Sequence, residues 1–512
     1  PRSKTVGSLS NPGTLEWQDV LSDQHIYPRV PQTADTIQQL RHVGEGLQPV
    51  FLSEYGIGSA VDLWRATRHF EQRRAERLED AQFFNDKLNR FLADWKQWHL
   101  ADTFDRPEDF FMASLKKMAG QRTLGLNAIR SNPNIVGYSL TGAIDHVMCG
   151  EGLTTLFREL KPGTIDALFD GWAPLRWCLF AEPANVYRGS KVHLEAVLAN
   201  ENVLLPGKYP ARLQVIGPNN SPLLDRAITV TIPKRDDNKE APLATKYFAE
   251  DITIDGPAGE YRFLATFDSG AAAGGGPAVF HVDDAAQMPP VETEVVLWGK
   301  DATLAKWLAD HGIRTRPFSP TAPTAREVIL ACGKHGTPED FRELARRMAS
   351  GSTVVFLSPA VFKKGDQPTG WLPMVNKGRL EPIWGWLYLK DEWAKRHPIF
   401  DGLPSGGLMD YTFYREIIPD LVFAGQSPPA EAVSGAIKAS QDYSSGLMVC
   451  EYSFGESRFI LNTLKIRENL GKHPAAERLL RNMLRYAARD AKKPLADLPA
   501  DFDTQLKAIG YR

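Results

Sequence analysis

One short segment constrains the fold of this chain more than any other feature of its sequence. Residues 49–56 read Pro-Val-Phe-Leu-Ser-Glu-Tyr-Gly, so an apolar run ends at Glu54 and a Tyr-Gly turn follows at once. A carboxylate at the point where a buried strand opens into a loop is held rigidly, and its oxygens still face a cleft. Parallel α/β folds present catalytic groups in this way, at the carboxyl ends of their strands. Because a short motif alone is weak evidence, a simply solvated Glu54 is the alternative.

The segments around this motif alternate between strand and helix patterns. Residues 15–21 form a short apolar run that leads into polar residues 22–28, and residues 31–44 carry apolar side chains at helical spacing before a glycine. Residues 135–140 predict a third strand. This order of strand, helix, strand, helix and strand is typical of a parallel sheet. All three strands end in polar residues, and we expect these residues to meet at one edge of the sheet.

These segments resemble the last three strand–helix units of the (β/α)8 barrel in family 2 glycoside hydrolases, the group of β-galactosidases, β-glucuronidases and β-mannosidases. In that family a strand ending in an acid-x-His-x-Tyr pattern is followed by one ending in Ser/Thr-Glu-Tyr-Gly. The matching residues of this chain are Asp23, His25, Tyr27 and Glu54. The resemblance implies that residues 1–174 are the C-terminal part of such a barrel, with a mostly helical insertion at residues 59–130.

The resemblance also implies roles for individual residues. Glu54 is expected to be the nucleophile of a retaining glycosidase, and Tyr27 to donate a hydrogen bond to it. The residues expected to line the sugar pocket are Asp23, His25, Tyr138, Thr141 and Asp145. The family usually has an aromatic residue at the end of its eighth strand, where this chain reads Gly-Tyr-Ser-Leu-Thr. The alternatives are an ordinary rim aromatic for Tyr27 and a buried, hydrogen-bonded core histidine for His25.

A retaining glycosidase needs two carboxyl groups about 5–5.5 Å apart. The family takes its acid/base from an Asn-Glu pair after the fourth barrel strand, and residues 1–15 contain no Glu. Asn200-Glu201 imitates that pair but falls in a region of different pattern, where a turn is expected. We therefore expect the acid/base to come from an N-terminal half, in a longer precursor or a second chain, and this chain alone to be nearly inactive.

Two further regions follow. From residue 175 the apolar side chains alternate with polar ones between Pro- and Gly-containing turns, which predicts an immunoglobulin-like β-sandwich over residues 175–283. Residues 291–490 alternate buried strands with capped helices, which is typical of a flavodoxin-like, doubly wound domain. Residues 491–512 are expected to be a C-terminal tail. The helical insertion is expected to pack over the barrel rim, with a tryptophan stacked on sugar as the alternative.

The last domain also resembles the class I glutamine-amidotransferase-like fold that accompanies some glycosidases and often serves assembly, so a homo-oligomer formed through it is possible. Amidotransferases need a cysteine on a Gly-x-Cys-x-Gly elbow, and Cys332 lacks both flanking elbow glycines. A buried, inert thiol is therefore expected at Cys332. The four cysteines stand alone without a C-x-x-C pair, which favours free thiols over disulfides or a metal site.

Composition excludes several classes of protein. The chain has 60 Lys and Arg against 62 Asp and Glu over 512 residues, and no basic block stands out, which argues against nucleic-acid binding. No stretch approaches the roughly 20 apolar residues of a membrane span. Residues 270–276 are rich in glycine but lack the context of a phosphate loop, and no cofactor or metal is expected. No targeting segment is recognisable, so the sequence assigns the protein to no particular cellular compartment.

Two functions from different classes remain. The first is part of an exo-acting retaining β-glycosidase that hydrolyses a β-linked oligosaccharide or glycoside. The second is a non-catalytic carbohydrate-binding or assembly protein with a degenerate barrel. Fold resemblance alone does not separate them.

Overall fold

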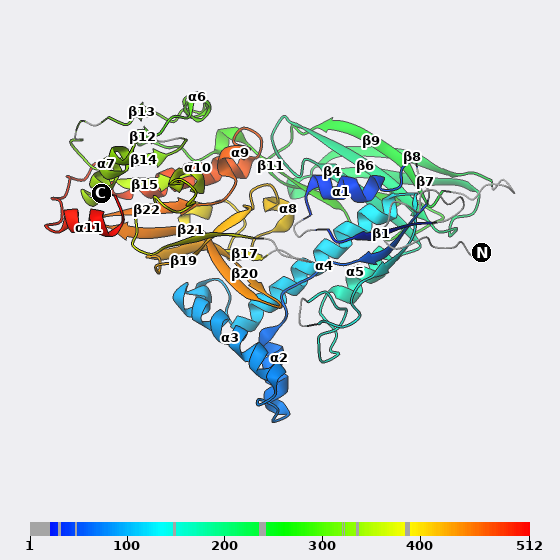
Figure 1. Cartoon of the computed structure of the whole chain (residues 1–512). Helices are drawn as coiled ribbons and strands as arrows, with labels where there is room; N and C mark the ends of the chain where they lie inside the picture. Colours follow the sequence, from blue (N-terminus) through cyan, green and yellow to red (C-terminus); the bar gives the residue numbers. More distant parts are fainter. Residues whose placement is uncertain are drawn as a thin grey trace.

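A computed structural model describes residues 21–28, 32–46, 49–146, 150–234, 242–319, 321, 323–333, 337–383 and 390–511. The chain is a mixed α/β protein in which three sheet-containing regions pack side by side (Figure 1). Three parallel strands form the sheet of the N-terminal region, and two sheets form the middle region, one antiparallel and the other antiparallel except for a parallel edge strand. The C-terminal region is built on a single large mixed sheet.

The N-terminal sheet has the strand order β1-β2-β3, with β1 at Ser22–Ile26, β2 at Val50–Tyr55 and β3 at Ile135–Leu140. Helix α1 (Ala34–His42) connects the first two strands; Thr33 caps its start by accepting a hydrogen bond from the Thr36 backbone. Parallel pairing sets His25 opposite Glu54, so the ends of β1 and β2 lie at the same edge of the sheet.

The second and third strands lie where the sequence predicts them. The first begins at Ser22, in the polar segment that follows the apolar run of residues 15–21. Residues 15–20 of that run lie outside the described residues. The parallel order of the three strands agrees with the alternation of strand and helix patterns in the sequence.

The insertion between β2 and β3 consists of α2 (Leu63–Gln72), α3 (Glu79–Gln97) and α4 (Pro107–Ser131). The expectation that it packs over the barrel rim is wrong for α2 and α3. Their apolar stripes join one core cluster with the C-terminal sheet, in which Trp98 packs against Trp393 with ring centroids 5.9 Å apart. An aromatic stripe of this length buries more area against a large sheet than against the ends of three short strands.

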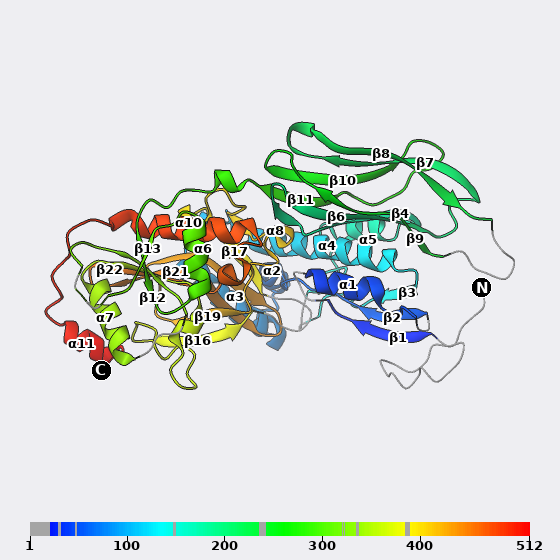
Figure 2. The same cartoon turned by 90° about the horizontal axis from the view of Figure 1, so that it is seen from above.

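Helix α4 is 25 residues long, roughly 37 Å at the standard rise. Its C-terminal half lies between the N-terminal sheet and the middle region, where Leu126 and Ile129 share a core cluster with Leu52 and Phe180 (Figure 2). It therefore serves as the crossover helix from β2 to β3. Helix α5 (Thr164–Gly171) follows β3 and packs on α4.

The middle region is a sandwich of two sheets around one core. The smaller sheet contains β4 (Leu175–Glu182), β6 (Lys191–Asn200) and β9 (Ala244–Thr253). The larger contains, in spatial order, β5 (Asn185–Tyr187), β11 (Ala278–Asp283), β10 (Gly259–Phe267), β7 (Gly207–Ile216) and β8 (Pro222–Ile232). Alternating burial along β7 and β10 supplies the larger sheet's face of the shared core.

The C-terminal sheet begins with five parallel strands. In spatial order they are β13 (Thr315–Pro317), β12 (Val295–Trp298), β14 (Val328–Ala331), β15 (Thr353–Phe356) and β22 (Ser457–Asn462). Numbered along the chain, this order is 2-1-3-4-5. An antiparallel extension follows with β21 (Tyr443–Phe454), β20 (Glu431–Ala439), β17 (Asp391–Ala394) and β18 (Gly407–Leu408), while β16 (Lys377–Pro382) and β19 (Leu421–Gln426) pair beside β21.

Helices cover both faces of the parallel strands. The clusters of buried side chains place α6 (Ala302–Asp310) and α10 (Pro474–Ala487) on one face and α7 (Pro338–Ala349) on the other. Three shorter helices are α8 (Tyr411–Tyr414), α9 (Ile466–Asn469) and α11 (Phe502–Ala508). The predicted tail folds back: Tyr511 is 2% exposed and packs against Trp371 and Phe341.

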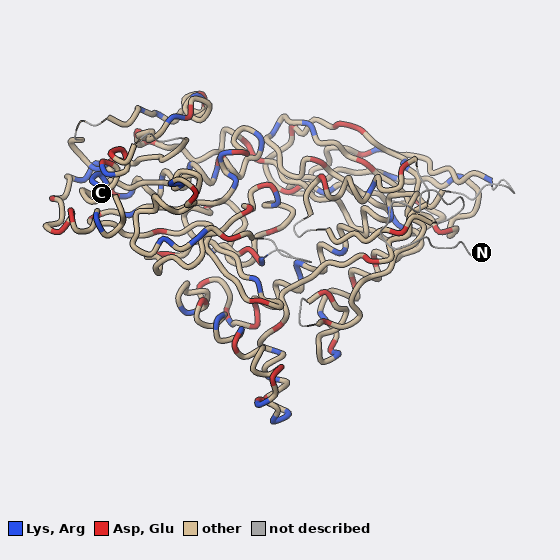
Figure 3. The backbone as a smooth tube through the Cα atoms, viewed as in Figure 1, with Lys and Arg blue, Asp and Glu red and all other residues tan. Residues whose placement is uncertain are grey.

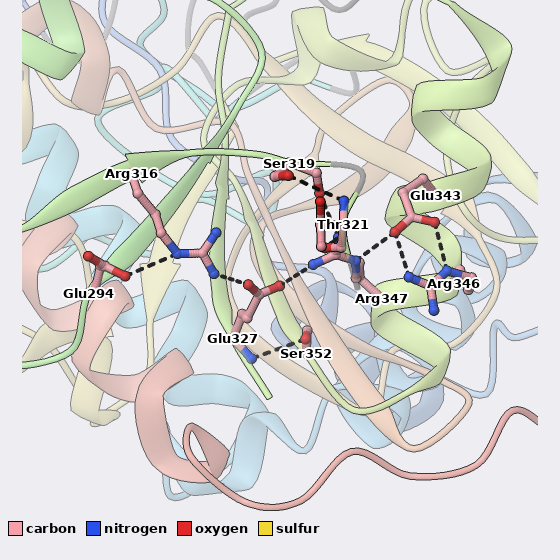
Figure 4. A network of polar contacts seen from close by, with 9 residues as sticks. All are labelled: Glu294, Arg316, Ser319, Thr321, Glu327, Glu343, Arg346, Arg347 and Ser352. Atoms are coloured by element: carbon pink, nitrogen blue, oxygen red, sulfur yellow. Dashed lines mark hydrogen bonds and ion pairs between the residues drawn. The ribbon is translucent and has the colours of Figure 1, made fainter. Parts of the chain in front are cut away.

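A polar network closes the amino ends of these parallel strands (Figure 4). Arg347 on α7 is 1% exposed and donates to Glu327, just before β14, over 2.7 Å, and to Glu343 over 2.6 Å. The backbone N–H of Glu327 also donates a hydrogen bond to Ser352 Oγ over 3.0 Å. Because each charge of this buried network has partners, it fixes the strand ends at low cost.

A second buried ion cluster joins the N-terminal and C-terminal regions. Lys117 on α4 lies 2.5 Å from Glu392 and 3.4 Å from Asp391 on β17, and Ser114 donates to Asp391 over 2.7 Å. Burial by itself lowers the pKa of Lys117, but the two carboxylates outweigh it and raise that pKa. Lys117 therefore remains a cation that neutralises buried acids.

Replacing Lys117 with Met should lower the free energy of unfolding by about 3–5 kcal/mol, since it leaves two buried carboxylates without a cation. Urea unfolding monitored by tryptophan fluorescence measures this loss. Lys306→Met is the matched control, because Lys306 is 76% exposed beside Asp310 and its loss should be small. Equal effects of the two substitutions would contradict a structural role for the buried cluster.

Candidate active site

Glu54 lies at the C-terminal end of β2, where side chains from three strands and the following loops converge. The Tyr27 hydroxyl donates a short hydrogen bond to Glu54 Oε2, and His25 Nδ1 lies 3.4 Å from the same oxygen. Tyr27 Oη is also 3.0 Å from Thr141 Oγ1. A phenol has one proton to donate, so Thr141 is the donor in that contact. The structure thus brings together four of the residues predicted for the site.

The carboxylate of Glu54 is accessible. Its side chain is 42% exposed, and that of His25 is 26% exposed, so the polar edge of this group faces solvent. Glu54 is therefore neither closed off from solvent nor tied into an ion pair within the core. A rigidly held, accessible carboxylate at the end of a parallel strand has the position and chemistry of a nucleophile or general base.

Tyr27 keeps its proton at neutral pH. Burial is the largest cause that raises the pKa of Tyr27 to about 12, and the hydrogen bond to Glu54 raises it further. Its hydroxyl consequently remains a donor over the whole physiological range. A neutral donor on one oxygen of Glu54 fixes the direction of the carboxylate.

The other predicted site residues are buried or line a different cavity. Asp23 is 3% exposed, and within the described residues neither of its carboxylate oxygens has a hydrogen-bond partner. Asp145 is 5% exposed and committed to its own loop, through Lys161 Nζ at 2.8 Å and the Gly152 N–H at 2.8 Å. The ring of Tyr138 lines a separate cavity together with Arg130.

Sequence reasoning missed one residue, Glu151. This side chain is 3% exposed, and its Oε1 lies 2.8 Å from His146 Nε2. Two glycines leave room for it: a Cβ at Gly56 would lie 2.8 Å from both Glu151 Oε2 and Tyr27 Cε1, and a Cβ at Gly142 would lie 2.6 Å from Glu151 Cγ. Glu151 therefore packs beside the ring of Tyr27. The available signal was a Gly-Glu-Gly triplet after the third strand.

The glycine that ends the Ser-Glu-Tyr-Gly motif should resist substitution for this reason. Gly56→Ala is expected to destabilise the protein by about 1–3 kcal/mol, because the new methyl group displaces either the Tyr27 ring or the buried Glu151 carboxylate. Differential scanning calorimetry would detect the change. Gly276→Ala is the control, because open space surrounds that position; a comparable loss there would remove the steric explanation.

Other classes of site find no support in the stretches of the chain that the structure describes. No group of three His, Cys, Asp or Glu residues is arranged to hold a metal ion, and no helix has the length and apolar character needed to cross a membrane. Charges of both signs are interspersed along the chain (Figure 3). Cys178, Cys332 and Cys450 are buried and unpaired, whereas Cys149 lies outside the described residues. Burial raises the pKa of Cys332 to about 12, which favours an inert thiol.

Comparisons with known proteins give distant likenesses only. No family model and no curated protein matches the chain. Among solved structures, an FMN-binding β-glucuronidase from Facaelibacterium prausnitzii L2-6 is 12% identical, with 52% of this chain and 32% of that chain covered and a TM-score of 0.19. A Bacteroides uniformis β-glucuronidase is also 12% identical, with 54% and 27% covered and a TM-score of 0.18. A CARDB domain from Pyrococcus furiosus is 15% identical, with 22% and 88% covered and a TM-score of 0.15.

The chain spans about a third or less of the two β-glucuronidases. With TM-scores below 0.2, these likenesses assign no role to the chain. A functional assignment therefore has to rest on the geometry of the chain itself.

Proposed function

We propose that this chain carries the nucleophile of an exo-acting retaining β-glycosidase. One observation supports this best: Glu54 is exposed at the end of a parallel strand, and Tyr27 and His25 both contact the same oxygen. That oxygen is thereby oriented, and the other is left to react. A simply solvated glutamate would need neither partner.

The proposal includes the fold. We assign β1, β2 and β3 to the C-terminal part of a (β/α)8 barrel, because they are parallel, connected by helices and converge at their carboxyl ends. The middle region is assigned as an immunoglobulin-like sandwich. The order 2-1-3-4-5 of the C-terminal parallel strands supports a flavodoxin-like domain, whose likeness to the amidotransferase-like fold is limited to architecture.

The chemistry follows from the carboxylate. Glu54 attacks the anomeric carbon of a β-linked glycoside, a new carbon–oxygen bond forms, and the bond to the leaving oxygen breaks with its electron pair. The leaving oxygen takes a proton from a second carboxyl group. Water then attacks the same carbon, gives up a proton to that second group and releases Glu54. In this scheme Tyr27 holds Glu54 in its reactive direction.

The second carboxyl group is proposed to come from an N-terminal half of the same enzyme. Among the acids in the strands and loops of this region, Asp23, Asp145 and Glu151 are each 5% exposed or less. None of them reaches a substrate as Glu54 does. In addition, β1 and β3 are the edge strands of the three-stranded sheet, and a closed barrel needs further strands beside them. Galactose, glucuronic acid and mannose are the candidate sugars.

Labelling with an activated fluorosugar tests the role of Glu54 without requiring an acid/base. A 2,4-dinitrophenyl 2-deoxy-2-fluoro-β-glycoside has a leaving group that needs no protonation, so the nucleophile alone should be trapped as a covalent adduct. Incubating the 512-residue chain with galactosyl, glucuronosyl and mannosyl reagents, followed by peptide mass spectrometry, should place the adduct on Glu54.

Two variants serve as controls for this experiment. Glu54→Gln should show no adduct while its circular dichroism stays unchanged, because the amide keeps the shape and loses the nucleophile. Tyr27→Phe should label about 10- to 100-fold more slowly, since it removes one hydrogen bond to a charged group. Labelling that persists in Glu54→Gln excludes Glu54 from the mechanism.

Leaving-group dependence tests the missing acid/base. The purified chain should release dinitrophenolate from a matching 2,4-dinitrophenyl β-glycoside but hydrolyse the methyl β-glycoside negligibly, because an alkoxide leaves only with a proton from a general acid. Comparison of the two rates by stopped-flow absorbance and sugar release measures this. Efficient hydrolysis of the methyl glycoside would show that this chain already supplies the acid.

A non-catalytic carbohydrate-binding or assembly protein is the second candidate. The burial of Asp23, Asp145 and Glu151 favours it, because a chain that only binds sugar needs no exposed acid pair. The fluorosugar experiment separates the two candidates, since a binder forms no covalent adduct. Assembly through the C-terminal region remains a proposal, to be tested by analytical ultracentrifugation.

A further inference from the structure

A cavity of about 540 Å³ opens where the N-terminal sheet meets the C-terminal region. Its first wall runs from His25 at the end of β1 to Pro28, and its second is formed by Thr33, Thr36 and Gln39 of α1 and its N-cap. The cavity volume falls within the range of about 300–1,000 Å³ that is usual for small-molecule sites.

The cavity adjoins the candidate active site through two shared residues. His25 and Tyr27 both contact Glu54, and both also line the cavity. A molecule in the cavity therefore lies against the groups that hold the carboxylate. The cavity is next to the reacting centre and is not a remote surface pocket.

The far wall of the cavity belongs to the C-terminal region and is held together by backbone hydrogen bonds. It contains Arg415, Asp420 and Lys465. The Lys465 N–H donates to the Ile417 carbonyl over 2.9 Å, and the Ile383 N–H donates to the Asp420 carbonyl over 2.9 Å. These backbone contacts hold separate segments in one surface, so the wall is pre-formed for a ligand.

The charges of this wall are balanced. Arg415 is paired with Glu182 and with Glu416, the latter at 3.3 Å, and Lys465 Nζ lies 2.8 Å from Asp420. No excess of either sign remains among these described groups to select an ion. The cavity is therefore suited to an uncharged ligand that uses these groups as hydrogen-bond partners.

The remaining lining has the mixed character that sugars require. Ile26, Ile383 and Ile418 provide an apolar surface, while Thr33, Thr36 and Gln39 contribute hydroxyl and amide groups from α1 and its cap. A pyranose ring has one apolar face of C–H groups and a rim of hydroxyls. Apolar lining with a few placed polar groups matches both features.

We propose that this cavity binds the leaving-group sugar of a β-linked substrate, so that the C-terminal region takes part in substrate selection. The inference rests on the proposed function, because Glu54 defines where the sugar transferred to the enzyme lies. In this proposal, the lining residues of α1 and Lys465 recognise an uncharged second sugar.

Binding of sulfur-linked disaccharides tests this assignment, because the sulfur linkage resists hydrolysis. The probes are β-thio-linked disaccharides with galactosyl, glucuronosyl or mannosyl non-reducing ends, each paired with its methyl β-thioglycoside, which lacks the second sugar. Isothermal titration of the 512-residue chain should show tighter binding of one disaccharide than of its methyl partner.

Thr36→Trp, which fills the cavity from α1, should weaken binding of that disaccharide by about 10-fold or more and leave binding of the methyl thioglycoside unchanged. Lys465→Ala should also weaken the disaccharide selectively, whereas Lys472→Ala, an exposed lysine outside the lining, should not. Circular dichroism checks that each variant folds.

The outcomes separate the two proposals. If the disaccharide binds no tighter than its methyl partner, or if Thr36→Trp and Lys465→Ala bind it unchanged, the cavity assignment is overturned even when the fluorosugar labels Glu54. If the disaccharide binds in the cavity and Glu54 is never labelled, the glycosidase proposal and the leaving-group role fail together.

Discussion

The packing of α4 is the constraint on which the rest of this structure depends. In its N-terminal half, Lys117 neutralises two buried acids of the C-terminal sheet. Further along, Arg122 donates to the carbonyl of Glu151 in the loop after β3, and at Gly125 the helix approaches the Tyr55 hydroxyl so closely that a side chain would collide with it. A single helix thus positions the C-terminal region and the loop that carries Glu151 relative to the same strands. The wall of the cavity beside Tyr27 depends on that arrangement.

Much of the local structure could be predicted from the sequence because it depends on short-range patterns. The apolar run before Glu54 is a strand, and the Tyr-Gly turn leaves the carboxylate at its exposed end. The hydrogen bond from Tyr27 to Glu54 was likewise expected, as what the resemblance to family 2 glycoside hydrolases implies. Helix caps such as Thr337, whose side chain pairs reciprocally with Asp340 at the start of α7, are also local signals.

Long-range packing was not predictable, and the reasons are physical. The stripe on α3 shows that the helix is amphipathic, but the period of a helix does not tell which surface covers it. Burial of Asp145 depends on Lys161, which follows it in a loop without periodic structure. Glu151 gave no signal beyond its two glycine neighbours, because the space it occupies is created by Gly56 and Gly142 in other segments.

Unsatisfied polar groups at the strand ends bear on whether this region is functional. Within the described residues, both oxygens of Asp23, His25 Nε2, Ser53 Oγ and Glu151 Oε2 are buried without a hydrogen-bond partner. Each such group costs about 1–3 kcal/mol, and native proteins hold few of them. These five atoms lie close to Tyr27 and Glu54 in the chain or in space, on the strands and loop that present the carboxylate. A sheet that served only as scaffold would be more stable with apolar residues at these positions, so their presence favours a surface that is completed by a ligand or by a further polypeptide segment.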